Sequence, residues 1–154
     1  MTATGSCIGL FLPWYSINQS GELLLARRSY RKKLWPGYWD GTVASHLFKS
    51  EDYEQASKRR LREEIGLTAT SIKYAFKFHY KIGYENIGIE HEICAVTIVR
   101  GVSFDSITPN SDEIWEIMFI DPGLLREKLE TGKDNYAPWL ILALNHMGEH
   151  SIAT

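Results

Sequence analysis

Residues 45–67 read SHLFKSEDYEQASKRRLREEIGL, and this stretch decides which fold we expect. It predicts a helix that ends at Gly66, because glycine tolerates the left-handed backbone found at helix C-termini. Arg60 lies three residues before Glu63 and four before Glu64, so a helix places the cation and both carboxylates on one side. Such a face can hold a hydrated Mg²⁺ ion and a diphosphate that the ion bridges.

The remaining segments alternate between strand-like and helical patterns, and they predict the fold class. Apolar and alternating runs predict a hairpin around a turn at 18–21, and strands at 7–15, 22–26, 38–45, 71–82, 89–99 and 114–120. Two further helices are expected: one that Asp121 caps and Pro122 opens, through about Glu130, and one from Trp139 to His146. This order predicts an α/β fold of the α/β/α sandwich type around a mixed β-sheet. We expect residues 1–154 to form a single domain, with a frayed tail at 148–154.

Two local details of these elements can also be predicted. Ser50 is the expected N-cap of the first helix, with Glu51 and Asp52 in its first turn. In the run 71–82, alternate residues should share one face, because the side chains of a strand point alternately to its two sides. The residues expected on that face are Ile72, Tyr74, Phe76, Phe78 and Tyr80.

The bulk composition excludes several classes of protein. A formal net charge of −2, with 23% charged residues, gives no overall field that attracts nucleic acid or an anionic membrane. No apolar run reaches the roughly 18 residues of a membrane span, and the opening segment lacks the basic start of a signal peptide. Cys7 and Cys94 show no metal-ligand spacing and are expected to be buried in a reducing compartment, so we expect a cytoplasmic protein.

The stretch 45–67 resembles the Nudix box, G-x5-E-x7-R-E-U-x-E-E-x-G-U, in which U is an apolar residue. Ser45 takes the place of the glycine, Glu51 that of the first glutamate and Arg59 that of the arginine. Arg60 departs from the pattern, which has a glutamate there. The later positions are in register: Leu61, Glu63, Glu64, Gly66 and Leu67. The resemblance implies a Nudix-type α/β/α sandwich in which Glu64 holds Mg²⁺ against a diphosphate, with Glu63 as a second candidate.

The Arg59–Arg60 pair, preceded by Ser45–His46, is similar to one branch in particular, the type I isopentenyl-diphosphate isomerases. Three further landmarks occur in that family's order: His79-Tyr80-Lys81, Glu90-His91-Glu92 and Ala137-Pro138-Trp139. The two glutamates of the second landmark share one strand face by alternation, and an isolated pair of this kind more often marks a solvated edge. The likeness runs from about residue 21 to residue 139.

The resemblance implies roles for five residues. In that family the histidine of the Ser-His pair and the two glutamates bind a divalent metal, and His46, Glu90 and Glu92 occupy those places. The catalytic glutamate maps to Glu92, its partner tyrosine to Tyr80, and the tryptophan that faces a carbocation to Trp139. An indole face attracts a cation, although core packing is the default explanation for any single tryptophan.

The segment LLLARRSYRKKLWPG, residues 23–37, also resembles the family, where an arginine and a lysine bind the substrate diphosphate. Arg28 and Lys32 match these two, and Arg60 matches a third phosphate contact, since several cations can form charge-assisted bonds to phosphate oxygens. For Lys32 an exposed basic loop is the alternative. The implied cofactor is Mg²⁺ or Mn²⁺, with a second divalent metal such as Zn²⁺ as a further option. The expected partner is a small-molecule diphosphate, not nucleic acid or a membrane, and the oligomeric state is open.

Two departures bear on the reaction. The family's catalytic cysteine falls on Ala44, and a methyl group donates no proton, whereas the isomerisation needs two acid/base groups facing each other. The chain is expected to start too late for two metal-binding histidines of the family, because Ile8 lies about where the nearer one belongs. We therefore expect an incomplete metal site that is filled by water, by His91 or His79, or not at all.

Three functions are compatible with these residues, and the sequence ranks the first of them, a hydrolase, just ahead of the second, an isomerase. The first is a Nudix hydrolase that cleaves a prenyl or other organic diphosphate with water activated by Mg²⁺ at Glu64 and Glu63; it needs no cysteine, although Arg60 replaces a carboxylate. The second is an isopentenyl-diphosphate isomerase in which Ser45 or a water replaces the cysteine. The third is a catalytically silent diphosphate-binding protein. Four tryptophans could line the pocket, the core or a partner surface: Trp14, Trp35, Trp39 and Trp115.

Overall fold

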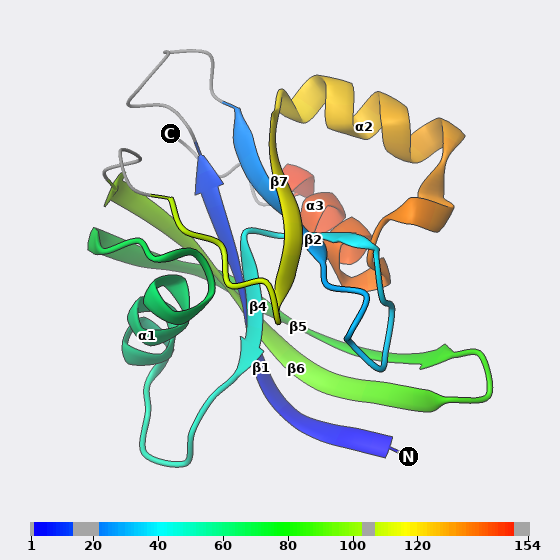
Figure 1. Ribbon diagram of the computed structural model, residues 1–154, viewed down its shortest axis with the longest axis horizontal. Helices are drawn as coiled ribbons and strands as arrows, with labels where there is room; N and C mark the ends of the chain where they lie inside the picture. The colour runs from blue at the N-terminus through cyan, green and yellow to red at the C-terminus, as the bar shows by residue number, and fades with distance from the viewer. Residues whose placement is uncertain (1, 14–21, 103–106, 150–154) are drawn as a thin grey trace.

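The computed structural model describes residues 2–13, 22–102 and 107–149, and its elements follow the predicted order (Figure 1). The strands are β1 (Thr2–Pro13), β2 (Leu23–Arg28), β3 (Trp39–Asp40), β4 (Val43–His46), β5 (Ala69–Tyr84), β6 (Gly88–Val102) and β7 (Ile114–Ile120). The helices are α1 (Tyr53–Ile65), α2 (Pro122–Thr131) and α3 (Pro138–Glu149), with a short 3₁₀ helix, η1 (Lys133–Asn135), before α3. The turn expected at 18–21, Trp14 and the side chain of Cys7 lie outside the described part of the chain.

Within the described residues, seven strands form one mixed sheet. The hydrogen-bonded order is β3-β2-β1-β6-β5, with β4 paired to β1 and β7 paired to β2. β1 and β6 run parallel, whereas the pairs β5–β6 and β2–β7 are antiparallel. Leu12 pairs with Leu24, which confirms the expected antiparallel contact between the first two strands.

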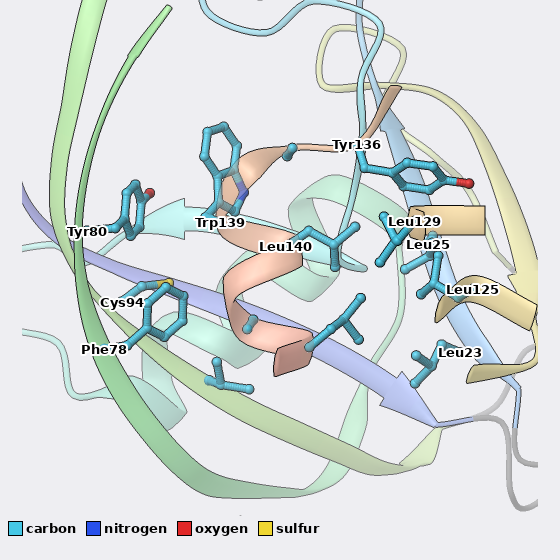
Figure 2. Close-up of a cluster of buried hydrophobic side chains, with 14 of the residues drawn as sticks. Leu23, Leu25, Phe78, Tyr80, Cys94, Leu125, Leu129, Tyr136, Trp139 and Leu140 are labelled. Atoms are coloured by element: carbon cyan, nitrogen blue, oxygen red, sulfur yellow. The ribbon is translucent and has the colours of Figure 1, made fainter. Parts of the chain in front are cut away.

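Helices cover both faces of this sheet, which confirms the expected α/β/α sandwich (Figure 1). On one face, Leu61 and Ile65 of α1 pack into an apolar cluster with Val99 of β6. On the other face, α2 and α3 close a second cluster, in which Leu140 lies near Leu129 of α2 and the ring of Trp139 stands beside Tyr80 (Figure 2). Each fully buried side chain of this kind contributes about 1.5–3 kcal/mol, so the two clusters hold the three layers together.

The ends of α1 show one confirmed prediction and one error. Gly66 ends the helix with a φ of 72°, as expected, and a side chain there would also collide with Thr108. The N-cap is Asp52 rather than Ser50, because the Asp52 carboxylate accepts from the Gln55 amide at 2.7 Å while the Gln55 side chain accepts from the Asp52 amide at 3.0 Å. This reciprocal pair, a capping box, satisfies two amides that the helix itself leaves without a partner.

A β-bulge in β5 changes the expected sharing of one face. The register with β6 shifts between Tyr74 and Phe76, so Ala75 is an extra residue and the alternation reverses there. Phe76, like the next two aromatic residues in the alternation, joins the cluster under α3. Tyr74 instead stacks on Tyr53 of α1, with ring centroids 5.9 Å apart, so the prediction that all five alternating residues share a face was wrong.

The remaining boundaries are close to those expected. The segment 38–45 forms two strands, because the chain turns at Gly41–Thr42, where the Thr42 hydroxyl donates to the Leu24 carbonyl at 2.5 Å. α3 continues to Glu149, so the prediction of a frayed tail was wrong for residues 148 and 149, and residues 150–154 lie outside the described part. The described helices are all too short or too polar to cross a membrane.

Candidate active site

The two glutamates at the charged end of α1 differ in exposure. Arg60 donates to Glu63 Oε2 at 2.8 Å and also bonds Glu64 Oε1. Glu63 is exposed and accepts a further bond from Arg59 at 3.2 Å, whereas the side chain of Glu64 is 7% exposed. Of the two carboxylates, Glu64 alone lines the cavity beside the helix.

That cavity lies between β2, β3 and the end of α1, and charged side chains line it. Two cations, Arg28 and Lys32, face three carboxylates, Asp40, Glu64 and Glu113. The free space is about 20 Å³, which admits about one water molecule. A diphosphate therefore enters only if some of these side chains move apart.

Burial raises the pKa of Glu64 to about 7, against the charge and hydrogen bond of Arg60, which lower it. Glu113 adds to the rise through its own negative charge. A carboxyl in this state is easily protonated near neutral pH, and a cation next to it would favour its ionised form. Glu64 is thus a carboxylate that a bound metal ion would stabilise.

Glu113 is a site residue that the sequence did not reveal. Its Oε2 lies 2.5 Å from Lys32 Nζ, and its Oε1 lies 3.8 Å from Arg60 Nη2. Burial acts to raise the pKa of Glu113, but the hydrogen bond from Lys32 and the charges of Lys32, Arg60 and Arg28 outweigh it and lower the pKa. An acidic residue directly before a predicted strand was the one available signal, and many loops share it.

Arg28 connects the cavity to the aromatic cluster. It donates through Nε to the Trp35 carbonyl at 3.1 Å and through Nη2 to the Leu34 carbonyl at 3.0 Å. Its third bond, from Nη1 to Asp40 Oδ2, measures 3.3 Å. The guanidinium carbon also lies 5.2 Å from the ring centroid of Trp139, so this ring already faces one cation.

Asp40 is the second site residue that the sequence did not reveal. Its Oδ1 accepts from the indole N–H of Trp139 at 2.9 Å and from the Gly41 amide at 2.7 Å. Burial raises the pKa of Asp40, against the charge of Arg28, which lowers it. Asp40 thereby fixes α3 and β2 at the same point of the site.

A second group of polar side chains lies at the β5–β6 hairpin. The Tyr80 hydroxyl donates to Glu90 Oε2 at 3.2 Å, and His46 Nε2 lies 3.0 Å from Glu92 Oε1. Burial raises the pKa of Glu90, against the charge of Arg28 and the bond from Tyr80. Tyr80 also stacks on Trp139 with ring centroids 6.0 Å apart, so this group adjoins the aromatic cluster.

Glu92 is the least satisfied carboxylate among the described residues. Its side chain is 1% exposed, and its Oε2 has no hydrogen-bond partner in the described part of the chain. Leaving a buried acceptor without a partner costs about 1–3 kcal/mol, more for a charged group. This oxygen can therefore accept a hydrogen bond or coordinate a cation.

His79 and His91 lie elsewhere. They bond to each other, with their Nε2 atoms 2.6 Å apart, on the face of the hairpin opposite Glu90 and Glu92. In this structure they do not complete the metal set around His46. No three His, Cys, Asp or Glu side chains of the described residues are arranged to hold a metal ion.

Comparisons with known proteins identify the family. The NUDIX domain family matches residues 15–140. This chain belongs to the NUDIX family. The isopentenyl-diphosphate Delta-isomerase of Klebsiella pneumoniae is 36% identical over 126 residues, which cover 81% of this chain and 67% of that protein. The enzyme of the same name from Haloarcula marismortui is 34% identical over 131 residues, covering 82% and 70%.

Among solved structures, the MutT protein of Methanosarcina mazei superposes on this Nudix chain with a TM-score of 0.76. The two are 16% identical over 99% of this chain and 98% of the other, which supports the fold alone. The curated relatives identify the branch of the family. This chain is an isopentenyl-diphosphate isomerase-like member of the Nudix family, as its motifs predicted. The matches support an enzyme.

The described residues of this Nudix chain offer one or two metal-ligand donors at each of two places. Glu64 offers one cavity-facing carboxylate, which suits Mg²⁺, an ion that proteins often hold through one or two carboxylates together with substrate phosphates. His46 and Glu92 offer an imidazole nitrogen and a carboxylate with one unpartnered oxygen, a donor set that suits Mn²⁺ or Zn²⁺. Glu90 instead accepts the hydrogen bond from Tyr80.

Proposed function

We propose that this chain binds a short prenyl diphosphate and moves its double bond, the activity named for its curated relatives. One observation carries the proposal. Arg28 lines the charged cavity and lies over the ring of Trp139, which is stacked on Tyr80. A diphosphate in the cavity would therefore direct its organic part toward the aromatic rings and the β5–β6 carboxylates.

The cations around the cavity would hold the diphosphate. Arg28 and Lys32 line it, and Arg28 is held by Asp40 and two carbonyls. Arg60 lies behind the lining carboxylates, with Nη2 3.8 Å from Glu113 Oε1, and would reach the diphosphate once Glu113 moves aside. Each cation can form charge-assisted bonds to phosphate oxygens. A divalent metal held by Glu64 would offset the remaining negative charge of the diphosphate when bound.

The proton transfers would take place at the β5–β6 group. One proton is added to the terminal alkene carbon, and one is lost from the neighbouring methylene, so the composition of the substrate does not change. Glu92, with Tyr80 and Glu90 beside it, can exchange a proton on one side. The ring of Trp139 would stabilise the positive charge between the two steps. Ala44 supplies no second acid, so Ser45 or a water takes that part in this proposal.

Hydrolysis of a diphosphate is the second candidate, and Glu64 in the cavity of a Nudix chain favours it. The sequence ranked it first. Arg60 weighs against it, because this arginine replaces a carboxylate of the motif, so fewer carboxylates are available to hold Mg²⁺ for water activation.

The test is incubation of the pure protein with isopentenyl diphosphate and Mg²⁺ or Mn²⁺ in heavy water. We expect deuterium in the recovered diphosphate and formation of dimethylallyl diphosphate, both increased in Ala44→Cys. Release of phosphate or pyrophosphate that Glu64→Gln abolishes would establish the hydrolase instead. Ligand-induced thermal stabilisation without either reaction, in the native chain and in Ala44→Cys, would leave a silent binding protein and refute both enzymatic proposals.

A further inference from the structure

We propose that Glu113 is an internal counter-anion, which occupies the phosphate-binding cations Lys32 and Arg60 when no substrate is present and so sets the affinity for diphosphate. This inference rests on the proposed function, because it takes the charged cavity as the diphosphate site. It goes beyond that function by naming the group that the substrate must displace.

The contacts of Glu113 resemble those expected of a phosphate. One oxygen lies 2.5 Å from Lys32 Nζ, and the other lies 3.8 Å from Arg60 Nη2. The two cations belong to different elements, the loop after β2 and helix α1, and a single carboxylate spans them. A phosphate group offers the same charge and oxygen acceptors to the same donors.

The backbone of Glu113 is held firmly, so only its side chain is free to move away. The Ser29 amide donates to the Glu113 carbonyl at 3.0 Å, and the Glu113 amide donates to the Asn110 carbonyl at 3.0 Å. The Asn110 amide in turn donates to the Glu64 carbonyl at the end of α1, at 2.7 Å. These backbone hydrogen bonds hold the backbone of Glu113 beside the end of α1, so its carboxylate can reach the cavity.

The cavity itself requires an exchange of partners. Its free space of about 20 Å³ does not admit a diphosphate while Lys32 is bonded to Glu113. The pKa of Glu113 lies below its ordinary value, so the group is an anion at neutral pH. Substrate binding must therefore replace the Lys32–Glu113 ion pair, and the apparent affinity is reduced by the fraction of molecules in which that pair is closed.

The experiment is calorimetric titration of inorganic pyrophosphate into the full chain and into Glu113→Gln, with and without Mg²⁺. We expect the variant to bind pyrophosphate about fivefold more tightly without metal, since an ion pair of this exposure contributes up to about 1 kcal/mol. The matched control is Glu116→Gln, from the same strand region, whose carboxylate pairs with Arg27 at 2.8 Å on the exposed surface. Its affinity for pyrophosphate should equal that of the native chain.

Each other outcome has a defined meaning. Unchanged or weaker binding by Glu113→Gln, while the native chain binds pyrophosphate, overturns the counter-anion role and leaves the proposed function intact. A loss confined to the Mg²⁺ titration also overturns it and makes Glu113 a metal ligand. If neither protein binds pyrophosphate, the cavity is not a diphosphate site, and the heavy-water assay will then show no exchange. Glu113→Asp, which shortens the reach to Lys32, should give an intermediate gain and serves if the glutamine variant does not fold.

Discussion

Two groups of charged side chains lie on either side of Arg28, and they are neutralised in different ways. The first group, which we propose to bind the diphosphate and name the phosphate end, consists of Lys32, Arg60, Glu64 and Glu113, and each carboxylate in it bonds to a cation. The second group, which we propose to exchange protons and name the proton-transfer end, consists of Tyr80, Glu90, Glu92 and Trp139. Its carboxylates face a hydroxyl and an imidazole, and Glu92 Oε2 has no partner among the described residues.

The difference shows what each end requires. The phosphate end is satisfied without a ligand, so binding there exchanges one set of ion pairs for another and gains only the difference between them. The proton-transfer end contains a buried acceptor that is unsatisfied, and such a group favours the arrival of a proton or a metal ion. Substitutions at the two ends should therefore alter different steps.

The largest effect is expected at the proton-transfer end, for Glu92→Gln. The amide cannot exchange a proton with the substrate, so the heavy-water exchange rate should fall about 10³-fold. Pyrophosphate binding should stay within about twofold, because the phosphate end is untouched. His91→Gln is the control, since that histidine lies on the opposite face of the hairpin and should leave both measurements unchanged. Equal loss of binding in Glu92→Gln would mean that the two ends do not act separately.

The phosphate end should show the converse behaviour for Lys32→Ala. Loss of one charge-assisted contact should weaken pyrophosphate binding about 30-fold, since hydrogen bonds to charged groups contribute about 1.5–3 kcal/mol. Lys33→Ala is the matched control, because Lys33 is exposed one residue later in the same loop. Calorimetric titration of both variants checks the prediction. Equal weakening by Lys33→Ala would mean that the loop attracts phosphate only through its total positive charge. Lys32 would then be a residue of an exposed basic loop, which is the alternative that the sequence left open.

Much of the fold could be predicted because its signals are local. The glycine at residue 66 and the Asp121–Pro122 pair mark helix ends by backbone geometry alone, and both were placed correctly. The wrong N-cap followed from a choice between two capable residues, and Gln55, three residues after Asp52, was the signal that favours the second. The bulge at Ala75 has no local mark, since its position is set by packing against α1 and α3.

The candidate site also contains residues that the sequence could predict and residues that it could not. The motif residues on α1 and on the β5–β6 hairpin have fixed spacing, so the sequence could name them. Asp40 and Glu113 could not be named, because their partners Trp139 and Lys32 lie 99 and 81 residues away along the chain. Contacts of this range depend on how strands and helices pack, and no periodicity encodes them. The motif named Glu64 first and Glu63 as a second candidate, and in the structure the Glu63 side chain is exposed while that of Glu64 is buried.

Asp40 lies between the two ends, and Asp40→Ala should lower the free energy of unfolding by about 2 kcal/mol. The substitution leaves the Trp139 indole N–H and one Arg28 donor without an acceptor in a buried place. Urea unfolding measures the loss. In the double variant with Trp139→Phe the loss should be smaller than the sum of the single effects, because the indole donor is then absent. Additive losses would mean that the Asp40–Trp139 bond contributes little.

The smallest effect is a pH dependence that separates Glu64 from Glu63. The pKa of Glu64 is raised from 4.5 to about 7, chiefly by burial, so between these values the folded protein binds more protons than the unfolded chain. The stabilisation from this carboxyl is complete below about pH 4.5 and is lost as the pH rises through about 7. Glu64→Gln cannot titrate, so in metal-free protein its Tm should exceed that of the native chain by a margin that grows across this window.

Glu63→Gln, changed at the exposed neighbour, should give a Tm profile parallel to the native one. Thermal unfolding in a chelator, scanned over pH, measures the three profiles. Parallel profiles for Glu64→Gln and the native chain would contradict a protonated Glu64 inside the phosphate end.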